Sequence, residues 1–251
     1  MGNVRGRDSQ GPRIRPFAWI RGRASLYTVR VPTKATHDAH PPVSEHAIRD
    51  FGWTNTAPHS SRYLHQRVLA ACDTLSPQAR VLDLGCGNGH FLSMLQSLGV
   101  CSLVGVDIAP DGVERARARC PDARIECIRA DANVLQTLDE DPFDLVVSTE
   151  VVEHVYDPDD WARTCRAALR PGGQLVCSTP YHGYAKNLAL CLMGRWDRHH
   201  QPLKLGGHIK FFSRHTLAAL LTRHDFADIR FTGAGRFPYL YKSMIASARA
   251  Q

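Results

Sequence analysis

The residues of this 251-residue chain with the clearest chemical potential form the glycine-rich segment VLDLGCGNG, at positions 81–89. Asp83 ends a predicted strand, and Gly85, Gly87 and Gly89 follow it at a spacing of two. Glycine allows positive φ and lets the backbone approach a ligand closely, and the helix that follows presents free N–H groups. The dinucleotide fingerprint G-x-G-x-x-G needs a further glycine where this chain has His90. The segment therefore predicts a ligand site at which NAD is disfavoured.

Acidic residues end the next two predicted strands. Asp107 comes eighteen residues after Gly89, and Asp131 follows the third strand. A carboxylate at the first of these positions can accept hydrogen bonds from both hydroxyls of a ribose. An acid at the second commonly meets an adenine amino group. Because the carboxyl ends of neighbouring parallel strands meet at one edge of a sheet, these residues predict a site for a nucleoside-containing cofactor.

The elements that must position these residues alternate short apolar strands with longer helical segments from residue 80 onward. Strands are expected at 80–84, 102–107, 124–130, 143–149 and 173–179, and helices at about 90–98, 110–119 and 158–169. A helix at 214–224 and strands at 226–233 and through 241–250 end the chain. This alternation predicts an α/β fold, a doubly wound and mostly parallel sheet with helices on both faces.

Two segments stand outside this alternation. Residues 41–79 form an N-terminal cap, a loop running into a helix, in which Trp53, Ser60 and Tyr63 are candidates to close over a cofactor. Residues 180–212 are too long for a plain connection and are interpreted as a substrate lid. Both ends of this insertion return to the cofactor face, so its aromatic and polar residues are expected to build the acceptor pocket.

The ordered motifs together resemble those of the class I S-adenosylmethionine-dependent methyltransferases. They comprise the glycine turn, Asp107, Asp131, TEVVEH at 149–154 and RPGGQL at 170–175, and span about residues 80–177. The pattern E-x-x-E-H, and HIKFFS at 208–213, are similar to the branch that contains the ubiquinone-biosynthesis O-methyltransferases. The resemblance implies a Rossmann-like seven-stranded sheet with the last strand antiparallel, and S-adenosylmethionine as methyl donor.

The resemblance also implies roles for single residues. Gly85 and Gly87, in one turn with Cys86 and Gly89, would cradle the aminocarboxypropyl part of the cofactor, and Asp83 would lie near its amino group. The remaining cofactor contacts would come from Asp107 and Ile108 at the ribose, Asp131 and Ala132 at the adenine edge, and Thr149 and Glu150 at the methionine moiety.

Methyl transfer to a hydroxyl requires alignment of the reactants and removal of a proton. His154 follows the fourth strand and its imidazole titrates near working pH, so it is the candidate base. Alternatively, His154 hydrogen-bonds a loop and closes the pocket. Glu153, His182 and His208 are the other catalytic candidates.

Metal binding is considered at two places. Glu150, Glu153 and His154 would share one face of a helical turn, and the resemblance allows a Mg²⁺ role there. Mg²⁺ prefers oxygen ligands, however, and a solvated helix end explains the two glutamates equally well. His199, His200 and His208 are also potential chelators, but no cysteine or carboxylate spacing supports a site. We therefore predict no metal site.

The charge of the chain bears on its partners and location. The formal net charge is +7, and residues 1–34 carry eight basic residues against one acid, which leaves the remainder neutral. Residues 1–40 are interpreted as a flexible basic extension, alternatively an organellar leader, and a nucleic-acid partner is not expected. No apolar run is long enough to span a membrane, and eight cysteines without a CxxC pair indicate reduced thiols. These features predict a cytoplasmic protein.

The sequence thus predicts an S-adenosylmethionine-dependent methyltransferase that acts on a small-molecule acceptor, at a hydroxyl oxygen in preference to nitrogen or carbon. A protein that binds S-adenosylmethionine without catalysing transfer is the alternative from another class. The identity of the acceptor and the oligomeric state are not set by the sequence.

Overall fold

The computed structural model describes residues 53–204, 206–238 and 240–251, so the predicted basic extension and residues 41–52 of the cap lie outside the described residues. The strands are β1 Arg80–Leu84, β2 Ser102–Asp107, β3 Arg124–Cys127, β4 Phe143–Thr149, β5 Leu169–Pro180, β6 Phe226–Ala234 and β7 Ser243–Ala250. The helices are α1 Ser61–Leu69, α2 His90–Ser97, α3 Pro110–Arg119, α4 Val134–Leu138, α5 Pro158–Ala168, α6 Tyr184–Leu192, α7 Trp196–His200 and α8 Arg214–Arg223.

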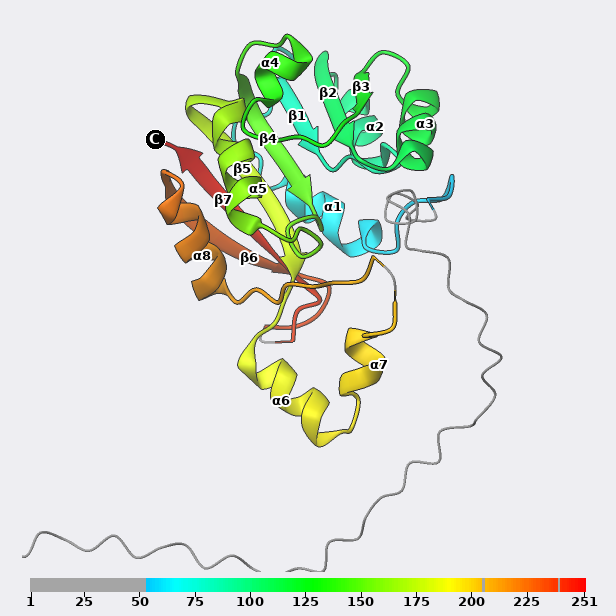
Figure 1. The fold of residues 1–251 in the computed structure, drawn as a ribbon, viewed down its shortest axis with the longest axis vertical. Helices are drawn as coiled ribbons and strands as arrows, with labels where there is room; N and C mark the ends of the chain where they lie inside the picture. The colour runs from blue at the N-terminus through cyan, green and yellow to red at the C-terminus, as the bar shows by residue number, and fades with distance from the viewer. Residues whose placement is uncertain (1–52, 205, 239) are drawn as a thin grey trace, which may run out of the picture. The chain divides into compact units, whose positions relative to one another are not determined.

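The strands form one seven-stranded sheet in the order β3-β2-β1-β4-β5-β7-β6, with helices packed on both faces (Figure 1). Strands β1 to β5 pair in parallel, whereas β7 runs antiparallel to both β5 and β6. The predicted fold, including the antiparallel last strand, is therefore confirmed. None of the described helices has the length and apolar character needed to cross a membrane. The cellular location stays a prediction.

Alternating strand residues fill two separate apolar cores. On one face, Leu82 and Val146 pack with side chains from α4, α5 and α8. On the other face, Val81 and Val147 pack with side chains from α1, α2 and α3. Because successive side chains of a strand point to opposite faces, short runs of apolar residues suffice to bury both sides of the sheet.

The structure differs from the sequence prediction mainly at β3, at α4 and in the insertion, and β5 begins at Leu169 rather than at residue 173. Strand β3 ends at Cys127 rather than residue 130, because its only neighbour, β2, ends at the paired residue Asp107. Helix α4 was not predicted, since a five-residue helix leaves too short a periodic pattern to recognise. The insertion at 180–212 contains two helices, α6 and α7, which lie beyond the carboxyl ends of the parallel strands (Figure 1).

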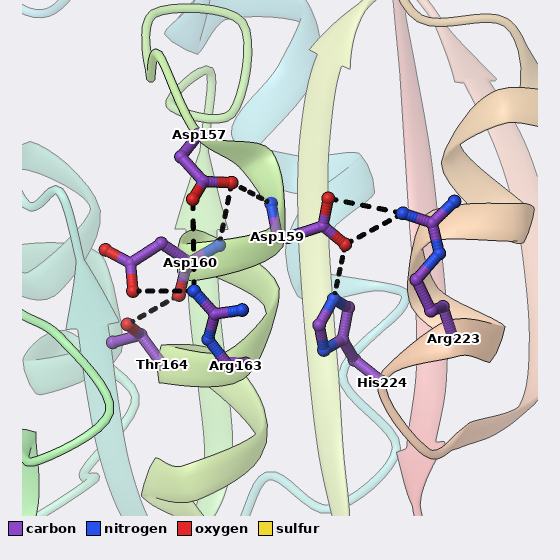
Figure 2. A network of polar contacts seen from close by, with 7 residues as sticks. All are labelled: Asp157, Asp159, Asp160, Arg163, Thr164, Arg223 and His224. Atoms are coloured by element: carbon purple, nitrogen blue, oxygen red, sulfur yellow. Dashed lines mark hydrogen bonds and ion pairs between the residues drawn. The ribbon is translucent and has the colours of Figure 1, made fainter.

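Helices α5 and α8 are joined by a polar network that positions the chain after β4 (Figure 2). The Asp157 carboxylate caps α5 by accepting hydrogen bonds from the backbone N–H groups of Asp159 and Asp160, at 2.9 and 3.3 Å. Asp159 then binds the guanidinium of Arg223 and the His224 ring, at 2.9 and 2.7 Å, on the α8 side. These hydrogen bonds lower the pKa of Asp159 below its usual value.

We expect Asp157→Ala to lower the free energy of unfolding by about 1 kcal/mol, because the first turn of α5 loses its capping acceptor. Asp157→Asn keeps an acceptor oxygen at the same place, so we expect it to retain most of that stability. Urea denaturation of both variants tests this account. Equal losses in the two variants would instead assign the effect to the lost charge.

Candidate active site

The glycine turn after β1 packs against three other parts of the chain. Gly85, Gly87 and Gly89 all have positive φ, at 86°, 51° and 71°. A Cβ atom on Gly85 would overlap the side chain of Val151, and one on Gly89 would lie 2.9 Å from the Cα atom of Ala116 in α3. The turn therefore requires glycine both for its backbone conformation and for its close packing.

The backbone of this turn is held by the end of β2. The N–H groups of Gly85 and Cys86 both donate to the carbonyl oxygen of Val106, at 2.8 and 3.0 Å. The side chain of Cys86 is buried against Gly105, so Cys86 contributes only its backbone to the predicted cofactor site. These bonds bring the predicted cofactor turn against the strand that ends in Asp107.

Asp107 sits half-buried where β2 meets the turn. Its carboxylate accepts hydrogen bonds from the N–H groups of Gly87 and Ala109, both at 2.8 Å. Burial raises the pKa of Asp107, and these hydrogen bonds act in the opposite direction. Ile108 follows it and is 39% exposed. A carboxylate oxygen has further acceptor capacity, so Asp107 suits the predicted contact with ribose hydroxyls.

Asp83 is a buried acid under the same turn. One of its carboxyl oxygens, Oδ1, has no hydrogen-bond partner within the described residues. Burial, and secondarily the charge of Asp107, raise the pKa of Asp83 to about 8. An unsatisfied buried acceptor is costly in a folded protein, so the donor it lacks is expected from a ligand. The cofactor's amino group, predicted at this position, is a donor of the required kind.

The other predicted cofactor residues also follow the ends of neighbouring strands. Thr149 ends β4 and is half-buried. Asp131 and Ala132 are exposed four and five residues beyond the end of β3, and Asp131 accepts a hydrogen bond from the Asn133 N–H at 2.7 Å. Because β3, β2, β1 and β4 are adjacent, the positions of all these residues agree with one elongated cofactor site.

Trp53 of the cap lies directly on the glycine turn. A Cβ atom on Gly87 would be 2.5 Å from its indole ring, and one on Gly112 would be 2.8 Å from it. The backbone N–H of Trp53 donates to the Asp111 carboxylate at 2.9 Å. The Asn88 side-chain amide donates to two cap carbonyls at 2.8 and 3.0 Å. The indole Nε1 is buried without a partner in the described part of the chain. The predicted closing role of Trp53 agrees with this position.

Two glutamates follow β4, one half-buried and one buried. Glu150 accepts hydrogen bonds from the hydroxyls of Ser178 and Ser243, at 2.9 and 3.2 Å, and burial raises its pKa to about 7. Glu153 is fully buried, and neither of its carboxyl oxygens makes a hydrogen bond of good geometry within the described residues. Burial and the nearby Glu150 raise the pKa of Glu153 well above its usual range. The neutral form is therefore favoured for Glu153.

His154 lies next to Glu153, with its Nε2 atom 4.0 Å from a carboxyl oxygen. Its Nδ1 atom is 3.3 Å from the carbonyl oxygen of Gly207, and its ring centroid is 4.9 Å from that of His208. Burial lowers the pKa of His154, so the imidazole is neutral at pH 7. The structure thus brings together three of the four predicted catalytic side chains, Glu153, His154 and His208. The contact between His154 and His208 joins the segment after β4 to the lid.

The last part of the lid is fastened at the same place. The N–H groups of Ile209 and Lys210 both donate to the carbonyl oxygen of Glu153, at 2.9 and 3.0 Å. The fourth predicted catalytic residue, His182, lies instead with His199 and His200, its ring centroids 6.2 and 5.5 Å from theirs. The insertion therefore contributes to two distinct histidine clusters.

The suggested helical face of Glu150, Glu153 and His154 is wrong. No helix forms at these residues, and Glu150 adopts a left-handed backbone conformation with φ of 54°. Glu150 turns to the two serines, while ligand atoms of Glu153, His154 and His208 lie within 4.8 Å of one another. One carboxyl and two imidazoles do not suit Mg²⁺, which prefers oxygen ligands.

Three residues of this site were not predicted from the sequence. Ser178 and Ser243 were predicted only as parts of strands. Ser178 lies near the end of β5, and Ser243 is the first residue of β7. Lys186 in α6 was placed in the lid without a role. It is buried, its Nζ donates to the Tyr181 carbonyl at 2.8 Å, and burial lowers its pKa to about 8.

The sheet order, the glycine turn and the acids at the carboxyl edge define a Rossmann-like methyltransferase of the S-adenosylmethionine-dependent class. A family model described as a methyltransferase domain matches residues 57–230, and the chain belongs to this family. The predicted recognition of a methyltransferase that uses this methyl donor is therefore confirmed.

Curated relatives match part of the chain. The ubiquinone biosynthesis O-methyltransferase of Cereibacter sphaeroides strain ATCC 17025 is 38% identical over 117 residues, which are 46% of this chain and 46% of that protein. The protein of the same name from Caulobacter sp. strain K31 is 36% identical over 117 residues, again 46% of each chain. The matching region thus spans about half the length of these curated relatives.

Solved structures match a larger share. An S-adenosylmethionine-dependent methyltransferase from Mesorhizobium loti covers 73% of this chain and 96% of its own, with a TM-score of 0.56 and 24% identity. The N-methyltransferase NodS from Bradyrhizobium japonicum, in complex with S-adenosyl-L-homocysteine, covers 74% of this chain and 85% of its own, with a TM-score of 0.53 and 19% identity. These likenesses support the fold.

We expect Asp83 to contribute a fall in the free energy of unfolding of the cofactor-free protein as pH rises from 5 to 8. The unfolded chain releases the Asp83 proton near pH 3.9, whereas the folded chain retains it up to about pH 8, so folding takes up a proton across this interval. In Asp83→Asn this contribution vanishes, so the change in stability between pH 5 and 8 differs from that of the wild type by roughly 4 kcal/mol.

Urea denaturation at several pH values measures this difference, and calorimetric titration with S-adenosylmethionine measures the accompanying change in affinity. Asp83→Asn is expected to weaken cofactor binding, because an amide is a poorer partner for an ammonium group. Parallel pH curves for the wild type and variant would contradict the assigned pKa of Asp83.

Proposed function

We propose that this protein transfers a methyl group from S-adenosylmethionine to a hydroxyl oxygen of a small-molecule acceptor. The observation that carries this proposal is a neutral histidine, His154, in the segment after β4 that packs on the glycine turn through Val151. Gly85 packs on Val151, which lies three residues before His154, and the lid segment 207–210 covers the same place. A proton acceptor beside a methyl-donor site is what a hydroxyl acceptor requires.

The residues present fit the cofactor. The turn at 85–89 leaves no room for side chains, Asp83 has an unsatisfied oxygen, and Asp107 is accessible at the end of β2. We assign the aminocarboxypropyl group to the turn and Asp83, the ribose to Asp107, and the adenine edge to Asp131 and Ala132. When bound, S-adenosylmethionine supplies an electrophilic methyl group on a sulfonium sulfur.

His154 is assigned as the base from its hydrogen bond to the lid. When Nδ1–H donates to the Gly207 carbonyl, Nε2 is the nitrogen that would take up the proton of the acceptor, and it lies 4.0 Å from a carboxyl oxygen of Glu153. The lowered pKa of His154 keeps that nitrogen able to accept a proton at pH 7. The ring of His208 packs against the imidazole with centroids 4.9 Å apart, and Glu153 lies 4.0 Å from Nε2.

The choice of oxygen over nitrogen or carbon rests on this base and on the relatives. The curated proteins that match are named O-methyltransferases of ubiquinone biosynthesis, which supports phenols and quinols as the acceptor class. A small molecule is proposed over nucleic acid because the chain outside residues 1–34 carries equal numbers of acidic and basic residues. Methylation of an amine or carbon, or cofactor binding without transfer, is the outcome that would replace this proposal.

We expect transfer of label from S-adenosylmethionine to phenols or quinols, and little or none to amino sugars and lipids, when the full chain is incubated with a panel of acceptors. His154→Ala should lower kcat/KM by at least 100-fold with cofactor affinity unchanged within about two-fold. His215→Ala, an exposed histidine of α8, serves as the matched control. Unchanged turnover in His154→Ala would sink the base assignment, and tight cofactor binding without transfer to any acceptor would favour the non-catalytic alternative.

The pH profile tests the same assignment independently. Because burial lowers the pKa of His154 below 6.5, we expect kcat/KM to lose activity only as pH falls beneath that value, where the ring gains a proton. The corresponding acid limb should be absent from the residual activity of His154→Ala. An identical limb in both proteins would assign it to another group.

A further inference from the structure

We propose that His182, His199 and His200 form a binding site for a single divalent transition-metal ion of the Zn²⁺ type, separate from the site of methyl transfer. One ring nitrogen from each histidine lies within 4.8 Å of those of the other two. His182 is only 7% exposed, and neither of its ring nitrogens has a hydrogen-bond partner among the described residues. The Nε2 atom of His200 is likewise buried without a partner there.

The unsatisfied nitrogens are the observation that points to a ligand. Buried polar atoms in native proteins are almost always hydrogen-bonded, so several orphans in one cluster require an explanation. A metal ion satisfies three imidazole lone pairs at once. The rings already face a common region, with the centroid of His182 lying 5.5 Å from that of His200 and that of His199 lying 4.9 Å from it.

The surroundings of the cluster are aromatic. The ring of Phe211 packs edge-on against both His182 and His200, with centroids 4.9 Å apart in each case. The indole of Trp196 packs on His200 at 4.1 Å. These neighbours fix the orientation of two of the three ligands. His199 is exposed, which leaves the remaining coordination position to solvent water.

The chemistry of the donors selects the class of metal. Imidazole nitrogen suits Zn²⁺, Co²⁺, Ni²⁺ and Cu²⁺, whereas Mg²⁺ and Ca²⁺ prefer oxygen. Burial keeps these rings neutral at pH 7, since it is the main cause that lowers the pKa of His182 to about 3 and that of His199 to about 4. Each ring therefore offers a lone pair without first releasing a proton.

Two cationic side chains face the cluster, Lys186 and Arg236, and His208 also acts on it electrostatically. The Lys186 ammonium is held by the Tyr181 carbonyl at 2.8 Å. These positive charges weaken the binding of any cation that is held by electrostatic attraction alone. A metal held by directed bonds to nitrogen tolerates them better, which again favours the Zn²⁺ type over Mg²⁺ and Ca²⁺.

Metal binding requires a modest closure of the cluster. Zn–N bonds of about 2.0–2.1 Å in a tetrahedral site put ligand nitrogens about 3.4 Å apart. The ring nitrogens of the three histidines lie up to 4.8 Å apart, so their separations must shorten by up to about 1.4 Å. Helix α7 is five residues long, its first four residues are exposed, and it carries two of the ligands in its last turn, so it can make this movement.

The position of the site gives it a consequence for the lid. His182 follows the end of β5 by two residues, while His199 and His200 end α7. A bound metal would fasten α7 to the carboxyl edge of the sheet at one end of the insertion. The other end is fastened without metal, by the hydrogen bonds of residues 207, 209 and 210 to His154 and Glu153. The site is thus a structural clamp on α6 and α7.

The test titrates the chelator-treated full chain with CoCl₂ and ZnCl₂, without methyl donor or acceptor. We expect one Co²⁺ per chain with visible absorption typical of tetrahedral coordination, displaced by Zn²⁺. His199→Ala and His200→Ala should each weaken Zn²⁺ binding at least ten-fold. His215→Ala, exposed on α8, is the matched control and should leave binding unchanged. Zn²⁺ should also slow proteolysis within residues 184–203 of the wild type, and not of His199→Ala.

His208→Ala separates this site from the cluster of Glu153, His154 and His208, which is also close enough to hold a metal. Loss of binding in His208→Ala but not in His199→Ala would move the metal to that cluster and overturn the proposal. Absence of Co²⁺ binding to the wild type would overturn it as well. Because no step uses the methyl donor, failure here leaves the proposed methyl transfer untouched, and failure of transfer leaves the metal site untouched.

Discussion

The structure depends on one steric constraint, the absence of side chains in the turn that follows β1. Gly85 lies against Val151 from the segment after β4, Gly87 lies under Trp53 of the cap, and Gly89 lies on α3. A single added methyl group at any of these three glycines would push one of those parts away. The turn therefore assembles the cap, the end of β4 and α3 around one point, before any ligand binds. Packing and cofactor recognition make the same demand on these residues.

The close packing around this turn is accompanied by the burial of acidic side chains at the same edge of the sheet. Asp83, Glu150 and Glu153 are buried close to the strand ends, and burial is the first cause of the raised pKa of each acid. Within the described residues, Asp83 and Glu153 are buried with no cation among the causes that shift their pKa values, and such carboxyls reduce stability at neutral pH, a cost that the apolar cores must offset. Functional sites commonly hold such strain. A positively charged ligand in this region relieves it, which couples cofactor binding to the stability of the domain.

Most of the sheet, and the cofactor motif, could be predicted from the sequence because their signals are local. The run 143–149 and the turn 81–89 carry their own pattern of apolar residues and glycines, and β4 begins and ends as predicted. The arrangement around Glu150 could not be predicted in the same way. Its spacing to Glu153 and His154 fits a helix, yet hydroxyls from β5 and β7, 28 and 93 residues away, capture its carboxylate. Partners that distant leave no periodic signal near residue 150.

The lid shows why spacing alone also misassigned the histidines. His208 was grouped in the sequence with His199 and His200, but it packs on His154, while His182 takes its place in the other cluster. The chain between residues 200 and 208 separates the two groups, because its far end is tied to the carbonyl oxygen of Glu153. The insertion therefore contributes histidines to two separate clusters. Helix α6, between His182 and His199, exposes Leu188 and Leu192, so this part of the insertion presents apolar side chains at its surface.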